Sequence, residues 1–218
     1  MKIPQLRKQT EKKNCHGYSW EDDYSWIHQD NCLEILRDTK KLNPEVRKYL
    51  EEENSYTKEI MRDTENLQKK IFKEIEGRIK LDDESLPFKD KKYDYWTKTT
   101  KEGNYAKKLR KKIGSDKVEC YFDGDLEAKG KKFFSTGDLA VSNNDEFLAF
   151  SVDDKGGEYF TIFIRRIEDN KIIDKIEDTA GGIVWSYDDK SFFYRKHDSQ
   201  KRPRQILQHK LGSPVLSL

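Results

Sequence analysis

The sequence predicts a mainly β protein with an α-helical N-terminal segment, whose strands form part of a β-propeller. Two stretches repeat one pattern: residues 135–153 (STGDLAVSNNDEFLAFSVD) and residues 179–196 (TAGGIVWSYDDKSFFYRK). Ser142 aligns with Ser186, 44 residues later, and the same offset relates Phe150 to Tyr194. A period of about 40 to 50 residues with several short strands in each unit is typical of propeller blades.

Composition narrows the class of protein further. Of 218 residues, 39% are charged and 34% hydrophobic, but an aromatic share of 12% argues against disorder. The net charge of +2 lacks the basic excess of most nucleic-acid-binding proteins. Neither a signal peptide at the N-terminus nor an apolar run of about 20 residues is present, so we expect a cytoplasmic protein without membrane contact.

The three cysteines, Cys15, Cys32 and Cys120, have no C-x-x-C spacing and cannot all pair, which suits a reducing compartment. His28, His197 and His209 show no helical spacing with each other or with the pair Cys15-His16. We therefore predict no metal site and no cofactor.

The N-terminal segment, residues 1–80, carries a helical pattern. Asn43 is a predicted N-cap, followed by Pro44 at the first helical position and Glu45 in the first turn. An amphipathic helix or helix pair then breaks near Gly77. Its apolar positions are Val46, Tyr49, Leu50, Ile60, Leu67, Ile71 and Ile75. Ahead of it, the cluster of Trp20, Tyr24 and Trp26 is more typical of a packed leader segment than of a ligand cage.

The period changes to that of strands in residues 81–218. Two segments rich in aromatic and β-branched residues flank Lys101-Glu102-Gly103-Asn104, which predicts a hairpin. The lysine-rich segment 105–113 has two interpretations. We expect an edge strand whose lysines block unwanted pairing, in preference to a nucleic-acid-binding patch.

The repeated units predict one complete and one incomplete blade. The expected strands are 139–142, 146–152, 159–167 and 171–177 in the first unit, and 182–186, 191–196 and 204–211 in the second. The gaps between them are rich in Asn, Asp and Gly, which tolerate turn geometry. A fourth strand in the second unit has no room to form.

Several stretches together carry a resemblance to a known family. They are HGYSWEDDYSWIHQDN, LNPEVRKYLEEENSYTKEIM, IEGRIKLDDESLPFKDKKYDYWTKTTKEGNY, FFSTGDLAVSNNDEFLAFSVD and TAGGIVWSYDDKSFFYRKHD. In this order and spacing they resemble the N-terminal part of the oligopeptidase B (protease II) group of the prolyl oligopeptidase family of serine peptidases. The resemblance extends from about Cys15 to Ser213.

The resemblance implies a cytosolic two-domain enzyme. In the family, N-terminal helices wrap an α/β-hydrolase catalytic domain, and a seven-bladed β-propeller admits only short peptides. Oligopeptidase B members cleave after Lys or Arg, using Ser, Asp and His of the catalytic domain that follows the propeller. By this resemblance, residues 1–80 are the wrapping leader, residues 81–218 are the first blades, and the catalytic domain is absent.

No residue of the chain qualifies as catalytic. An α/β-hydrolase nucleophile requires G-x-S-x-G, but Phe133 stands where Ser135 would need the first glycine, and Ile183 follows Gly181-Gly182. The trio His197-Asp198-Ser199 has the right side chains, yet neighbours along a strand or tight loop point in different directions. We therefore predict no catalytic, cofactor-binding or metal-binding residue here and no activity of the chain alone.

Three functions follow as hypotheses. The first is an N-terminal fragment of an oligopeptidase B-like peptidase, truncated near Pro214–Leu218, where the sequence departs from the family as after a frameshift. Its partner would be a separate polypeptide with the rest of the propeller and the catalytic domain. The second is a stand-alone protein-interaction module, and the third, less favoured, is a nucleic-acid binder. A two-blade fragment is expected to expose apolar residues such as Leu139, Val141, Phe150 and Trp185 unless a partner covers them.

Overall fold

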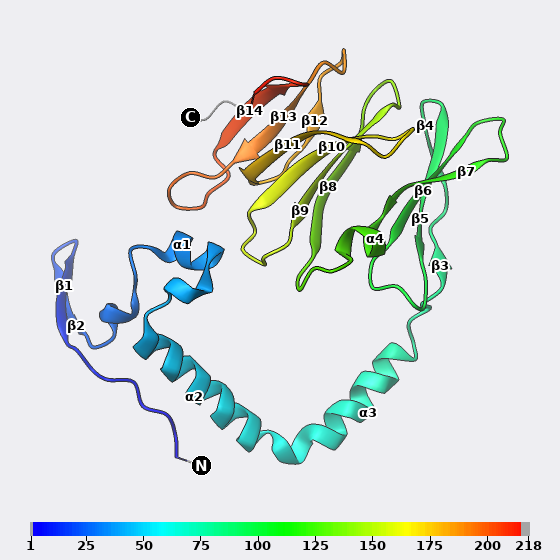
Figure 1. Ribbon diagram of the computed structural model, residues 1–218. Coiled ribbons are helices and arrows are strands. Elements are labelled where there is room, and N and C mark those ends of the chain that lie inside the picture. Colours follow the sequence, from blue (N-terminus) through cyan, green and yellow to red (C-terminus); the bar gives the residue numbers. More distant parts are fainter. Residues whose placement is uncertain (1, 215–218) are drawn as a thin grey trace. The chain divides into compact units, whose positions relative to one another are not determined.

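The chain forms two compact units, residues 1–79 and residues 80–218, and the computed structural model describes residues 2–214 (Figure 1). The first unit consists of a β-hairpin, a short helix and two longer helices. As predicted, α2 begins at Pro44, where the Asn43 side chain accepts hydrogen bonds from the N–H groups of Glu45 (2.8 Å) and Val46 (3.4 Å). The elements are β1 (Glu11–Cys15), β2 (Tyr18–Asp22), α1 (Cys32–Arg37), α2 (Pro44–Ile60) and α3 (Glu65–Glu76).

The predicted helix pair is confirmed, but its apolar side chains are mostly exposed within this unit. Val46 is buried, whereas five of the predicted apolar positions farther along α2 and α3 are between 47% and 58% exposed. These exposed residues are Leu50, Ile60, Leu67, Ile71 and Ile75. The helical pattern of the sequence therefore indicates an apolar stripe that the described residues of the first unit do not cover.

The second unit contains three antiparallel sheets that stand side by side in chain order (Figure 1). The first consists of β3 (Asp83–Glu84), β4 (Phe88–Asp90), β5 (Tyr93–Thr99), β6 (Lys107–Lys112) and β7 (Val118–Asp123), and it is followed by α4 (Gly124–Ala128). The second consists of β8 (Ser135–Val141), β9 (Phe147–Asp153), β10 (Phe160–Arg166) and β11 (Ile172–Thr179). The third, within the described residues, consists of β12 (Val184–Trp185), β13 (Ser191–Lys196) and β14 (Gln205–Lys210).

The predicted strands are confirmed with small shifts at their ends. The largest shift is in β8, which begins at Ser135, four residues before the predicted start. The register between β8 and β9 shifts between Thr136 and Leu139, because the N–H of Asp138 donates to the Ser151 hydroxyl (2.8 Å). A bulge of this kind interrupts the alternation of side chains from which strands are predicted.

The expectation that the lysine-rich strand lies at an edge was wrong. β6 pairs with β5 on one side and with β7 on the other, so it is an interior strand. Two of its four lysines have partners on those neighbours: Lys108 donates to Thr97 (3.0 Å), and Lys107 forms an ion pair with Asp123 (2.7 Å). Long lysine side chains can cover apolar surface while the ammonium group reaches a polar partner, which the sequence pattern alone does not distinguish from an edge strand.

The repeated motif is a β-turn built twice. The Ser142 hydroxyl donates to Asn144 Oδ1 (2.7 Å) and accepts from the N–H of Phe147 (2.9 Å). Ser186 repeats both contacts, donating to Asp188 (2.7 Å) and accepting from Ser191 (3.1 Å). At the next turn position, Asp145 and Asp189 both have a left-handed backbone, with φ of 68° and 56°. The sequence echoes itself because each blade must close this turn with the same side chains.

The core lies between the sheets. One cluster contains Phe122 and Phe134 together with Leu148, Phe150 and Val152 of β9, and a second joins the second sheet to the third. The second cluster comprises Ala149, Ile162, Ile164, Ile176, Ile183, Phe192 and Tyr194.

The expected exposure of Leu139, Val141, Phe150 and Trp185 was therefore wrong. Phe150 is only 1% exposed, and the other three are partly buried against the two core clusters. The first sheet covers one face of the second sheet, and the third sheet covers the other. The expectation rested on the two repeated units alone, whereas the divergent first sheet also covers the second.

Replacing the fully buried Ser142 with alanine is expected to lower the free energy of unfolding by about 1 to 3 kcal/mol, because the partly buried N–H of Phe147 loses its acceptor. Urea unfolding followed by circular dichroism measures the change. Ser199→Ala is the matched control, since Ser199 is exposed in a loop. An unchanged unfolding midpoint for Ser142→Ala would contradict the role given to the turn.

Candidate functional site between the first two sheets

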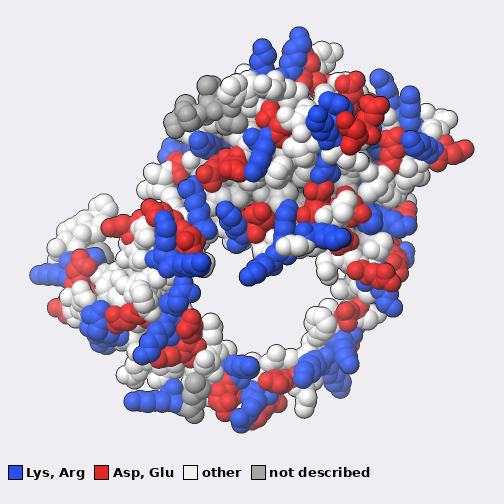
Figure 2. Space-filling model, viewed as in Figure 1, with Lys and Arg blue, Asp and Glu red and all other residues white. Residues whose placement is uncertain are grey.

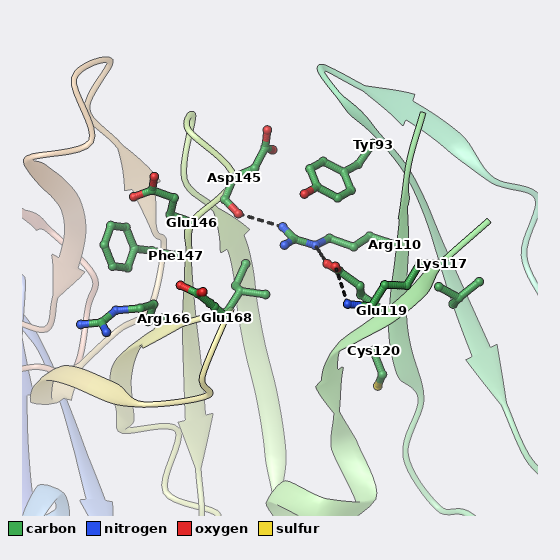
Figure 3. Close-up of a pocket in the computed structure, with 12 residues that line it drawn as sticks. Tyr93, Arg110, Lys117, Glu119, Cys120, Asp145, Glu146, Phe147, Arg166 and Glu168 are labelled. Carbon is green, nitrogen blue, oxygen red and sulfur yellow. Dashed lines mark hydrogen bonds and ion pairs between the residues drawn. The ribbon is translucent and has the colours of Figure 1, made fainter. Parts of the chain in front are cut away.

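A pocket of about 700 Å³ opens between the first and second sheets (Figure 3). On one side it is lined by Arg110 of β6 and by residues at the start of β5 and β7. On the other side lie the turns that follow β8 and β10. The pocket therefore forms where two blades meet, and no single blade contains it.

Arg110 of β6 joins the two sheets at this pocket (Figure 3). Its Nε donates to Glu119 (3.0 Å), and its Nη1 donates to the carbonyl oxygen of Asp145 on the second sheet (2.9 Å). The guanidinium carbon lies 4.2 Å from the centre of the Tyr93 ring. The side chain is almost fully buried, so its charge is stabilised by these contacts and not by water.

Arg110 is a contact residue that was not predicted from the sequence. Arg110 lies in the segment expected to be an exposed edge strand, whereas its side chain is only 5% exposed. One signal was available: the segment KKLRKK contains a single arginine among lysines. The planar guanidinium can serve a carboxylate and a carbonyl at once, which a lysine does less well.

Tyr95 and Asp145 form the second contact between the sheets. The Tyr95 hydroxyl donates to Asp145 Oδ1 (3.3 Å), and burial together with the nearby Asp145 carboxylate raises the pKa of Tyr95. Burial likewise raises the pKa of Tyr121 to about 12; its ring packs edge-on against Tyr95, with the ring centres 5.7 Å apart. Both phenols therefore stay protonated at neutral pH, and Tyr95 can act as a hydrogen-bond donor.

The chemistry of this site is that of binding and positioning. Lys117, Arg166, Glu146 and Glu168 give the pocket charges of both signs. Cys120 is the available thiol, but desolvation raises its pKa although the residue is exposed, so the reactive thiolate is disfavoured. Among residues 2–214, no group of three or more His, Cys, Asp or Glu side chains could hold a metal ion.

His197 and Asp198 belong to the trio that was excluded above as a catalytic triad, and they contact an aromatic ring and the backbone of their own loop. The His197 ring packs edge-on against Tyr159, with the ring centres 5.2 Å apart. The Asp198 carboxylate accepts hydrogen bonds from the N–H groups of Gln200 and Arg202, both at 2.9 Å, and the backbone hydrogen bond from Arg202 lowers its pKa. The carboxylate thus shapes its own loop, and the arrangement is not that of a base oriented toward a nucleophile.

The surface carries both signs of charge. On the face shown in Figure 2, Lys and Arg side chains alternate with Asp and Glu, without an extended area of one sign. None of the helices in the described part of the chain is long and apolar enough to cross a membrane.

Comparison with known proteins agrees with this arrangement of three side-by-side sheets. Residues 4–217 match the family model of the prolyl oligopeptidase N-terminal β-propeller domain. The chain belongs to this family. The match extends to residue 217, so the expectation that Pro214–Leu218 departs from the family was wrong for most of that segment; residues 215–218 lie outside the described structure.

Curated relatives within the prolyl oligopeptidase family are peptidases. The chain is 28% identical to dipeptidyl aminopeptidase BI of Pseudoxanthomonas mexicana, over 92% of this chain and 29% of that protein. It is 26% identical to protease 2 of Moraxella lacunata, over 100% of this chain and 31% of that protein. The chain thus spans less than a third of the length of these relatives.

Solved structures agree with the family. Oligopeptidase B from Leishmania major superimposes with a TM-score of 0.85 and 27% identity, over 97% of this chain and 31% of that one. Oligopeptidase B from Trypanosoma brucei, solved with covalently bound antipain in a closed form, gives a TM-score of 0.83 and 25% identity over 98% of this chain and 31% of that one. The resemblance to an N-terminal part of oligopeptidase B and the mainly β propeller fold are thereby confirmed.

Arg110→Leu is expected to lower the free energy of unfolding by about 3 kcal/mol, because the substitution leaves the Glu119 carboxylate and the Asp145 carbonyl without their donor. Urea unfolding gives the value. Lys111→Leu, on the neighbouring position of the same strand, is the control and should change it by less than about 1 kcal/mol. Equal effects of the two substitutions would show that Arg110 does not join the sheets.

Alkaline pH is expected to destabilise the second unit through Tyr121. Its folded pKa of about 12 lies above the value of about 10 for an unfolded chain. The resulting stability is complete below pH of about 10 and is lost as the pH rises toward 12. Tyr121→Phe should therefore flatten the fall of unfolding free energy over this range. Tyr187→Phe is the control, because Tyr187 is 97% exposed; a slope unchanged in Tyr121→Phe would refute the assignment.

Proposed function

We propose that this chain is the N-terminal part of an oligopeptidase B-like serine peptidase and that it does not hydrolyse peptides alone. Residues 1–80 act as the leader that wraps the catalytic domain, and residues 81–218 supply the first blades of the β-propeller. The complete enzyme cleaves short peptides after Lys or Arg. A separate polypeptide supplies the remaining blades and the Ser, Asp and His of the catalytic domain.

One observation carries the proposal: the match to Leishmania major oligopeptidase B covers 97% of this chain but only 31% of that protein. The likeness includes both the helical leader and the sheets, which a match to a propeller alone would not give. The stand-alone interaction module is not favoured, because nearly the whole chain follows peptidase relatives.

The local chemistry supports inactivity of the isolated chain. No G-x-S-x-G elbow is present in the sequence, and Asp198, the carboxylate beside His197, is engaged by the backbone of its own loop. The exposed apolar side chains of α2 and α3 are consistent with a leader that requires a host domain.

Purification of the tagged chain from its native cells, followed by labelling with a fluorophosphonate serine probe, tests this function. We expect the probe to label a co-purifying polypeptide and not the 25.9 kDa chain. The complex should hydrolyse fluorogenic dipeptides ending in Arg or Lys much faster than a matched dipeptide ending in Pro, while the isolated chain should hydrolyse none.

Labelling of the 25.9 kDa chain itself would overturn the proposed inactivity. A labelled partner with a preference for Pro would place the complex elsewhere in the family. Recovery of the chain without a labelled partner would contradict the split enzyme. The tagged Arg110→Leu variant serves as a control for folding, since capture that depends on the folded sheets should weaken with it.

A further inference from the structure

Each basic side chain of the inter-sheet pocket already has a carboxylate beside it. Arg110 donates to Glu119 (3.0 Å), and the Lys117 ammonium group lies 4.0 Å from the same carboxylate. Arg166 donates to Asp169 (3.1 Å). Arg110, Lys117 and Arg166 are the basic residues that line the pocket. Further negative charge in the pocket is therefore not neutralised by its own basic side chains.

Two further acidic residues, Glu146 and Glu168, line the same pocket. Both are exposed, and within residues 2–214 neither carboxylate forms a hydrogen bond or an ion pair. The repeat shows that the fold does not require them, because the positions 44 residues later, after β12 and β14, are Lys190 and Gly212. The two charges therefore belong to this boundary between sheets and not to the construction of a blade.

Asp145, which also lines the pocket, is buried with one carboxylate oxygen lacking a donor. Its Oδ1 accepts a 3.3 Å hydrogen bond from Tyr95, but its Oδ2 accepts none from the part of the chain that the structure describes. The equivalent carboxylate one blade later is saturated. Asp189 accepts from the N–H groups of Asn143 and Asn144, both at 2.7 Å, and from the Asn143 side chain (2.9 Å). The first boundary therefore lacks N–H donors that the second boundary has, and a buried oxygen without a donor is costly.

The shape and charge of the pocket favour a small organic cation. Asp145, Glu146 and Glu168 all lie on the wall that the second sheet forms (Figure 3). The volume of about 700 Å³ is in the range of small-molecule sites. A guanidinium or ammonium group carries both a positive charge and several N–H donors. An anion would instead be repelled by three carboxylates on one wall.

We propose that this pocket binds an organic cation with a guanidinium or primary ammonium group, such as an arginine or lysine side chain. Glu146 and Glu168 hold the charge of the ligand, and Asp145 contributes a third negative charge on the same wall. The pocket is built entirely from residues between Tyr93 and Glu168, so the inference does not depend on the proposed function or on a second polypeptide.

Calorimetric titration of the full chain with N-acetylarginine amide tests the site. The matched ligand is N-acetylcitrulline amide, in which a neutral urea group replaces the guanidinium. We expect the arginine derivative to bind about tenfold more tightly, with an affinity that falls as the salt concentration rises. Propylguanidine, which lacks the two amide groups, separates the sources of the cation. Equal affinity indicates a free small cation, and weaker affinity indicates the side chain of a peptide.

Substitutions that remove charge but keep shape assign the binding to these residues. Glu146→Gln and Glu168→Gln should each weaken binding of the arginine derivative about threefold, and the double variant about tenfold. The unfolding midpoint should stay nearly unchanged, because both side chains are exposed and make no contact that holds the fold. Glu102→Gln is the control, since Glu102 is exposed and does not line the pocket.

Equal affinity for the arginine and citrulline derivatives would overturn the cation site, as would binding that the double variant leaves unchanged. Tighter binding of N-acetylglutamate amide than of the arginine derivative would assign the pocket to anions, against the proposal. None of these measurements requires a peptidase partner, so a failure of the proposed function is recognised separately by the serine-probe labelling.

Discussion

The second unit depends on contacts between neighbouring sheets, because each sheet is a single layer that cannot bury a face by itself. Both core clusters contain residues from more than one blade or connecting segment. Phe150 illustrates the constraint: its ring lies 5.3 Å from that of Phe122 in the first sheet. Stability in such an arrangement is a sum of blade and interface contributions, as in other repeat proteins.

Polar contacts at the rims of the sheets explain how so charged a sequence can fold around a small core. Arg110 joins the first two sheets, Arg165 forms an ion pair with Glu127 (2.5 Å), and His209 meets Asp174 across the second and third sheets (2.7 Å). Each pair is largely removed from water and fixes the register of one blade against the next. Buried ionic contacts add little net stability compared with apolar packing, but removing one partner is costly. Their value here lies in specifying a single arrangement of the sheets.

The parts of the fold that local sequence determines were predicted well. The N-cap Asn43, the strand β13 (Ser191–Lys196) and the paired turns at Ser142 and Ser186 follow from capping, alternation and turn chemistry within a few residues. Arg110 and Phe150 were misjudged because their burial depends on another sheet, with partners such as Asp145, 35 residues away from Arg110. The inter-sheet pocket was equally out of reach, since its two walls come from different blades.

Two side chains of the third sheet reach back along the chain to the second sheet. The Asp189 carboxylate accepts from the N–H groups of Asn143 and Asn144, and the Trp185 indole donates to the carbonyl of Ala140. On a ribosome, the earlier blade has therefore emerged with its acceptors and donors in place before the side chains that engage them are made. Each new blade can fold against a finished surface, so synthesis from the N-terminus supplies the order of assembly that a ring of similar blades does not itself encode.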